Sequence, residues 1–168
     1  VEVGAVLEPA LPTGKSGYVE ALRAARGRGV PWLRAEAGRR FDVDGMIVEV
    51  LHPPATPRDP QPERRDANST SVVVAVRFGA FDALLTGDAP AEVEREVAGA
   101  LGGGFEVLKV AHHGSDTSTD SVLLARTRPR VGLVSVGRGN RYGHPSPDVL
   151  GRLRRAGTEV RRTDREGT

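Results

Sequence analysis

The chain has 168 residues, enough for one domain with a hydrophobic core, and its 24 Lys and Arg against 22 Asp and Glu leave a mild basic excess. That excess permits a nucleic-acid partner without requiring one, while the absence of cysteine excludes disulfides and thiolate metal ligands. No apolar run is long enough to span a bilayer, and the first residues lack the pattern of a signal peptide, so we expect a soluble domain.

The first part of the chain predicts one helix, several short strands and a loop. The helix spans residues 16–31, because apolar side chains recur at helical spacing after Ser16 and glycines follow. Residues 53–67, PPATPRDPQPERRDA, carry prolines and charges without periodicity, which predicts an exposed loop. Strands are expected at 1–7, 31–36 and 46–51, and a turn is expected at 41–45.

The second part of the chain alternates strands and helices at α/β spacing. Two apolar runs, at 70–79 and 80–87, meet at a glycine and predict a hairpin. The helix at 90–101 begins with a proline, carries acidic residues in its first turn and ends at three glycines. Further strands are expected at 105–111, 130–137 and 158–163, and further helices at 120–129 and 147–157. The predicted fold class is α/β, with a mixed sheet and flanking helices.

Three polar clusters directly follow predicted buried strands. They are Thr86-Gly87-Asp88, His112-His113-Gly114-Ser115 and residues 140–145, NRYGHP. Loops beyond strand ends in layered α/β folds face a common crevice, where sites are built. The clusters hold one carboxylate and three of the four histidines, and these donors suit zinc, manganese or iron. We therefore predict a metal site drawing on Asp88, His112, His113 and His144.

Each candidate also has a structural interpretation. Asp88 can cap the helix that follows it, the histidine pair can belong to a polar loop, and His144 before a proline can be a turn residue. Their occurrence together at strand ends favours the metal site. Ser115 lacks a G-x-S-x-G context, which disfavours a serine hydrolase. His52, before two prolines, has no such neighbours and is interpreted as structural.

Five blocks, in order and closely spaced, resemble a known family. They are NSTSVVVAV at 68–76, LLTGD at 84–88, LKVAHHGS at 108–115, VSVGRGNRYGHP at 134–145 and TDREG at 163–167. These blocks resemble the metallo-β-lactamase domain at the C-terminal end of ComEC-type DNA-internalisation competence proteins. The resemblance implies an αβ/βα sandwich, of which residues 1–168 would form the C-terminal portion.

The resemblance implies a binuclear metal-dependent hydrolase, with two divalent ions, zinc or manganese, and no small organic cofactor. It gives Asp88 the role of bridging ligand, and it makes His144 and one of His112 and His113 the other ligands. Adjacent side chains on a strand point to opposite faces, so only one of the pair should face the crevice. We favour His113, because Gly114 beside it would open the crevice.

Lys109 precedes the histidine pair and is a candidate catalytic residue. Its cation could stabilise a phosphoryl oxyanion, and its alternative role is that of a lysine at the edge of the core. The main metal-binding block of the superfamily, H-x-H-x-D-H, is absent from the sequence. We therefore expect a part of a longer domain, which on its own binds metal weakly and lacks nuclease activity. A divergent domain that has lost its metal is the other interpretation.

The function implied by the resemblance is cleavage of DNA phosphodiester bonds during uptake. The implied partners are single-stranded DNA and the remainder of a membrane channel protein, which would tether the domain outside the cytoplasm. Two other functions stay open: a stand-alone hydrolase of a small phosphoester or lactone, and an inactive domain that binds DNA or a competence partner. Candidate contacts to the DNA backbone, or else parts of a solvated surface, are Arg138, Arg141, Arg152, Arg154, Arg155, Arg161 and Arg162.

Overall fold

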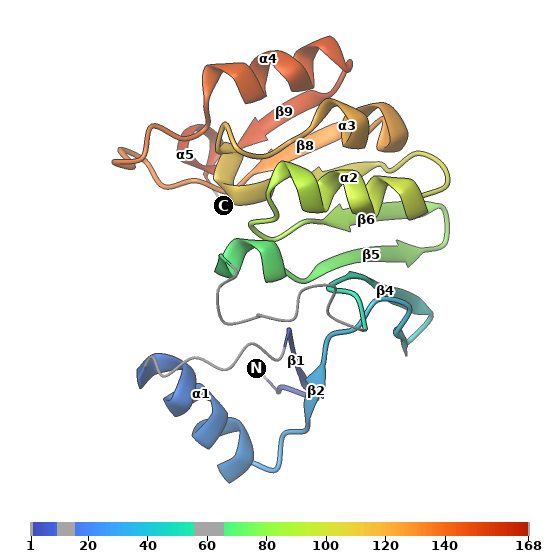
Figure 1. Cartoon of the computed structure of the whole chain (residues 1–168), viewed down its shortest axis with the longest axis vertical. Helices are drawn as coiled ribbons and strands as arrows, with labels where there is room; N and C mark the ends of the chain where they lie inside the picture. Colours follow the sequence, from blue (N-terminus) through green and yellow to red (C-terminus); the bar gives the residue numbers. More distant parts are fainter. Residues whose placement is uncertain (1, 10–15, 56–65, 168) are drawn as a thin grey trace.

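The computed structural model describes residues 2–9, 16–55 and 66–167 and is built on a seven-stranded sheet (Figure 1). The strands follow one another across the sheet in chain order: β3 (Arg40–Val43), β4 (Met46–His52), β5 (Val73–Phe78), β6 (Phe81–Leu85), β7 (Val107–Lys109), β8 (Val131–Val134) and β9 (Glu159–Arg162). Neighbours are antiparallel from β3 to β6 and parallel from β6 to β9. The predicted mixed sheet is confirmed.

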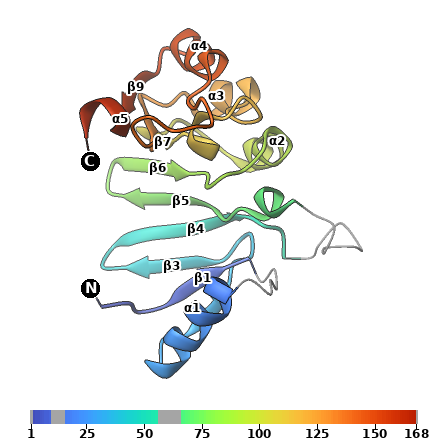
Figure 2. The same ribbon diagram turned by 90° about the vertical axis from the view of Figure 1, so that its left-hand side faces the viewer.

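Three helices cover one face of this sheet (Figures 1 and 2): α2 (Ala91–Ala100), α3 (Ser121–Thr127) and α4 (Pro147–Arg155). Their first turns are fixed by local chemistry. Asp120 accepts a hydrogen bond from the backbone of α3, and Ser146 accepts one from the backbone of α4, where a proline opens the first turn. Helices α3 and α4 therefore begin directly after the residues that cap them.

The first part of the chain forms a small parallel sheet of β1 (Val6–Glu8) and β2 (Trp32–Arg34), connected by α1 (Ser16–Gly27). In Figure 2 this unit lies beyond β3, at the far end of the molecule from α4. The turn expected at 41–45 forms at Asp44 and Gly45, after β3, which occupies the first residues of this segment and pairs with β4. Phe41 and Val43 alternate with polar residues there, which is the period of a strand.

The loop predicted at 53–67 falls largely outside the described residues, at 56–65. Pro53, at its start, is buried, so the predicted exposure is wrong at this position; its carbonyl accepts a hydrogen bond from the backbone of Ala37. The loop ends in the 3-10 helix η2 (Ala67–Thr70). The two other short elements are the 3-10 helix η3 (Ala111–Gly114) and α5 (Thr163–Glu166).

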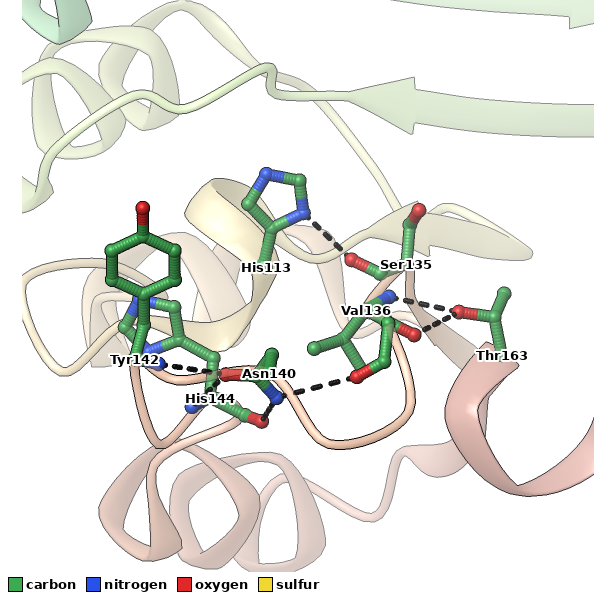
Figure 3. A pocket seen from close by; sticks show the side chains of 8 residues that line it. His113, Ser135, Val136, Asn140, Tyr142, His144 and Thr163 are labelled. Carbon is green, nitrogen blue, oxygen red and sulfur yellow. Dashed lines mark hydrogen bonds between the residues drawn. The ribbon is translucent and has the colours of Figure 1, made fainter.

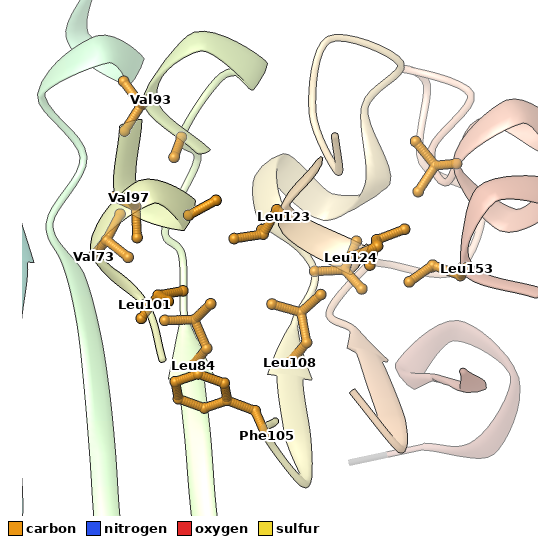
Figure 4. Close-up of a cluster of buried hydrophobic side chains, with 14 of the residues drawn as sticks. Val73, Leu84, Val93, Val97, Leu101, Phe105, Leu108, Leu123, Leu124 and Leu153 are labelled. Carbon is orange, nitrogen blue, oxygen red and sulfur yellow. The ribbon is translucent and has the colours of Figure 1, made fainter. Parts of the chain in front are cut away.

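The core lies between the sheet and its three covering helices (Figure 4). Leu84 of β6 and Leu108 of β7 are paired in register and fully buried, and side chains from all three helices close over them. The helix side chains labelled there are Val93, Val97, Leu123, Leu124 and Leu153. Burial of a leucine side chain stabilises the folded chain by about 1.5–3 kcal/mol. This layer is the main source of stability of the sheet.

Alternate strand positions face away from these helices and remain exposed. Phe78 pairs in register with Phe81 at the hairpin turn, and Leu85 and Leu133 both flank Lys109 across the sheet. The four apolar side chains are between 40% and 58% exposed. We call this surface the open face of the sheet. No described helix is long and apolar enough to cross a bilayer.

Candidate metal centre

The candidate residues gather at one edge of the sheet, where the parallel strands β6, β7 and β8 end. Asp88 follows β6, the histidine pair follows β7, and the loop with His144 follows β8. Parallel pairing of these strands brings their carboxyl ends to a common edge, as the sequence predicted. The strand pairing therefore places together residues that are more than fifty positions apart in the chain.

Asp88 has its carboxylate free to bind and does not cap a helix. The residue that caps α2 is Pro90, without a side-chain hydrogen bond, so the capping interpretation of Asp88 is wrong. The backbone N–H of Asp88 donates to Ser71 Oγ at 3.2 Å. The Oδ1 atom lies 3.7 Å from His113 Nε2 and 3.9 Å from Lys109 Nζ. An exposed carboxylate between an imidazole and an ammonium is a suitable ligand for a cation.

The histidine pair lies in η3 and not in a strand, because β7 ends at Lys109. The rule of opposite side-chain faces therefore does not apply to it. His112 and His113 have φ values of 48° and 57°, in the left-handed region that residues other than glycine seldom adopt. Such a conformation costs about 1–3 kcal/mol per residue and is found mainly at functional sites. The N–H of His112 donates to the carbonyl of Gly87, tying this turn to the loop of Asp88.

The proton of His113 is positioned by a backbone carbonyl. Its Nδ1 lies 2.6 Å from the carbonyl oxygen of Ser135, a contact drawn in Figure 3. A carbonyl oxygen can only accept, so Nδ1 carries the proton, and in the neutral ring the lone pair is then on Nε2. That nitrogen is the one beside Asp88. The same arrangement orients metal-binding histidines in proteins.

His112 and His144 form a second group. Their ring centroids are 5.8 Å apart, and the ring of Tyr142 stacks on His144 at 6.0 Å with an interplanar angle of 18°. Asn140 holds this loop: its Oδ1 accepts the N–H groups of Tyr142 and His144, and its Nδ2 donates to the carbonyl of His144 at 2.7 Å. The sequence placed Asn140 in this cluster but gave it no role, and it gave Tyr142 none.

Gly114 packs against the loop of His144 and does not open the crevice. A Cβ at this position would lie 2.5 Å from Pro145 Cβ and 3.0 Å from Pro145 Cα, and its φ is 83°. Its carbonyl accepts the N–H of Ser146 at 2.8 Å. The reason given for favouring His113 was therefore wrong, although His113 is the histidine that lies beside Asp88.

Lys109 lies beside Asp88, as expected of a residue near the site. Its Nζ donates to the carbonyl of Gly87 at 2.8 Å. Burial lowers the pKa of this ammonium, and the negative charge of Asp88 opposes the shift. The catalytic role of Lys109 remains a prediction.

The fit to a metal ion is partial. Two donors that each lie about 2.1 Å from a tetrahedral zinc ion are about 3.4 Å apart, and Asp88 Oδ1 and His113 Nε2 are close to that separation. Yet residues 2–9, 16–55 and 66–167 contain no group of three or more His, Asp or Glu that could hold a metal. These residues can supply two ligands of one ion and do not complete its shell.

His52 lies outside this site and is structural, as its sequence context indicated. It is buried, and its Nδ1 lies 2.9 Å from the carbonyl oxygen of Ser71. Ser71 in turn accepts the N–H of Asp88 through its hydroxyl. His52 thus contacts the segment between η2 and β5 that bonds Asp88, and does not itself belong to the site.

Two adjoining pockets open beside His113. The first, of about 400 Å³, contains His113, Asn140, Tyr142 and His144 (Figure 3). The second, of about 270 Å³, contains Lys109 and Arg161. Both share Ser135 and Thr163, so they run side by side across the ends of β7 and β8. The site is a groove of substrate size.

The chain matches several competence proteins over most of its length, although no family model matches it. ComE operon protein 3 of Bacillus subtilis is 35% identical over 88% of this chain and 18% of that protein. Recombination protein 2 of Haemophilus influenzae is 39% identical over 76% of this chain and 15% of that protein. Competence protein ComA of Neisseria gonorrhoeae is 36% identical over 78% of this chain and 18% of that protein. This sequence is homologous to a part of ComEC-type competence proteins. It spans less than a fifth of the length of these ComEC-type relatives.

The solved structures confirm the fold expected for the ComEC-type domain. CmlA of Streptomyces venezuelae, a diiron β-hydroxylase, aligns with a TM-score of 0.58 over 95% of this chain and 38% of its own, at 12% identity. A mutant of the same enzyme aligns with a TM-score of 0.56. At that identity the likeness shows the fold alone. The chain corresponds to the C-terminal portion of a metallo-β-lactamase fold and consists of a mixed sheet with flanking helices.

Proposed function

We propose that this chain is the C-terminal part of a metal-dependent nuclease domain that cleaves single-stranded DNA during uptake. The observation that carries the proposal is the approach of His113 Nε2 to the Asp88 carboxylate, 3.7 Å apart, at the strand ends of a metallo-β-lactamase fold. The names of its relatives, a recombination protein and a competence protein among them, support DNA as the substrate.

Asp88 and His113 would hold a divalent ion, with the other ligands supplied from outside the described residues. Such an ion supplies an activated water near neutral pH and neutralises charge on the phosphate. Lys109 presents its ammonium 3.9 Å from the Asp88 carboxylate, where it attracts a phosphate oxygen. Its bond to Gly87 fixes this position before substrate binds.

The surface charges beside the groove favour an anionic polymer. Arg138 and Arg141 are exposed on the loop after β8, and Arg141 forms no ion pair or hydrogen bond with any residue that the structure describes. Three of the other arginines expected to bind DNA are engaged instead. Arg161 and Arg162 pair with acidic residues, and Arg152 donates to loop carbonyls.

The open face of the sheet supports a larger domain. The exposed apolar side chains on this face are of the kind that a sandwich fold buries between two sheets. We propose that a second sheet, carrying the H-x-H-x-D-H block, covers it. In the whole protein this domain would be tethered to the membrane outside the cytoplasm.

The test is DNA cleavage and metal content in the full-length natural protein. Asp88→Asn or His113→Ala should lower metal-dependent cleavage by about 100-fold or more, since even the loss of an outer-shell partner costs roughly 10–100-fold in metal affinity or activity. Bound metal, measured by elemental analysis, should fall in parallel. The matched control is Asp44→Asn, which lies in the β3–β4 turn at the opposite edge of the sheet. Cleavage by the Asp88 variant equal to that of the control would disprove the assignment.

A further inference from the structure

The loop after β8 presents one aromatic ring to solvent beside the groove. Tyr142 is 76% exposed, although it belongs to the lining of the pocket that also contains His113. The ring is nearly parallel to the imidazole of His144, with the two centroids 6.0 Å apart, and most of its surface is open to solvent. In Figure 3 Tyr142 and His113 project from their loops toward the same side.

The ring is held in place before any ligand binds. The Asn140 side chain bonds the backbone on both sides of Tyr142, and the parallel packing on His144 restricts the ring further. His144 is followed by Pro145, which packs against Gly114 of the histidine turn. A preorganised aromatic ring loses little conformational entropy when a flat group stacks on it.

The chemistry around this ring suits a nucleotide. The pocket lining contains no carboxylate, so it does not repel an anionic backbone, and its volume of about 400 Å³ accommodates a base with its sugar. Arg138 and Arg141 precede the ring in sequence and are exposed. Aromatic rings interleaved with cations are the elements that bind single-stranded nucleic acid.

We propose that Tyr142 forms a nucleobase subsite, in which a base of single-stranded DNA stacks on the open face of the ring next to the site of cleavage. The subsite rests on the proposed function for the nature of its ligand. A base in a duplex has both faces covered by its neighbours, so the subsite selects an unpaired or frayed nucleotide. Stacking has little preference among the bases, which suits an enzyme that meets DNA of any sequence.

The test is oligonucleotide binding by the full-length natural protein without divalent metal, measured by fluorescence anisotropy at fixed salt. Tyr142→Ala should weaken binding of a short single strand by about tenfold, within the range of a lost base stack. Tyr142→Phe should bind as the unmodified protein does. Neither variant should change binding of a strand that has abasic sites throughout. Asp44→Asn, in the β3–β4 turn away from the groove, is the control.

The outcomes separate this subsite from the nuclease itself. Equal binding of the single strand by Tyr142→Ala and by the control, or equal weakening by Tyr142→Phe, overturns the subsite while leaving the nuclease proposal intact. If binding depends on Tyr142 but the protein never cleaves DNA, the subsite is supported and the proposed nuclease activity is disproved. Absence of binding to every oligonucleotide overturns the subsite, whereas the nuclease proposal is decided by the cleavage test.

Discussion

The two faces of the central sheet differ in what covers them. On one face, Leu84 and Leu108 lie beneath three helices and are removed from water. On the other, Leu85 of β6 and Leu133 of β8 remain at least 40% exposed. The side chains are of the same type, so composition does not distinguish the faces. The difference shows that apolar strand positions stabilise this chain only where a second layer lies over them.

The largest expected effect comes from removing a leucine under the helices. Leu108→Ala should lower the free energy of unfolding by about 3–5 kcal/mol, because it loses burial and leaves a cavity. Leu133→Ala, on the next strand and the open face, should change it by less than about 1 kcal/mol. Chemical denaturation of both variants measures the difference. Equal losses would show that the open face is covered.

The next effect concerns the close approach of two site loops. Gly114→Ala should destabilise the chain by about 2–4 kcal/mol, because the added methyl group overlaps Pro145 and the residue has a positive φ. Gly139 also has a positive φ, of 69°, but has open space around it. Gly139→Ala therefore isolates the conformational cost and should lower the free energy of unfolding by about 1 kcal/mol. Thermal unfolding gives both values. If Gly114→Ala is as stable as Gly139→Ala, the two loops do not pack directly against each other.

A smaller effect is expected from an acidic residue within the covered layer. Glu94 of α2 is only 2% exposed, and burial raises its pKa to about 7. Its Oε2 accepts the N–H of Asp120, while Oε1 has no hydrogen-bond partner among the described residues. Arg152 donates to the carbonyls of Ser118 and Thr119 from the other side. Together they hold the loop that connects the histidine turn to α3.

The sign of the pH dependence follows from this raised pKa. Between pH 4.5 and about 7 the folded chain binds more protons at Glu94 than the unfolded chain does, so the contribution of the group to stability falls as the pH rises through 7. Glu94→Gln should therefore be more stable than the natural chain at pH 8, by about 1–3 kcal/mol, and should lose this pH dependence. Glu92→Gln, exposed on the same helix, is the control. An unchanged pH profile in Glu94→Gln would show that Glu94 stays ionised in the folded chain.

Much of the covered layer could be predicted from the sequence because its signals are local. Asp120 marks the start of α3, and Ser146 with Pro147 marks the start of α4, each through a hydrogen bond within the first turn. The strand ends at Asp88 and at the histidine pair were recognisable for the same reason. The turn conformation of His112 and His113 was not predictable, because it depends on a hydrogen bond to Gly87 from another loop.

By itself, the sequence determined the α/β alternation, the strand ends that carry the candidate ligands, and the likeness to ComEC-type proteins. The tertiary structure alone decided which donors meet. It placed His113 beside Asp88 and His112 beside His144, filled the space at Gly114 with Pro145, and left Tyr142 exposed on an imidazole. Periodicity and caps arise from neighbours within a few residues, whereas these contacts join loops brought together only by strand pairing.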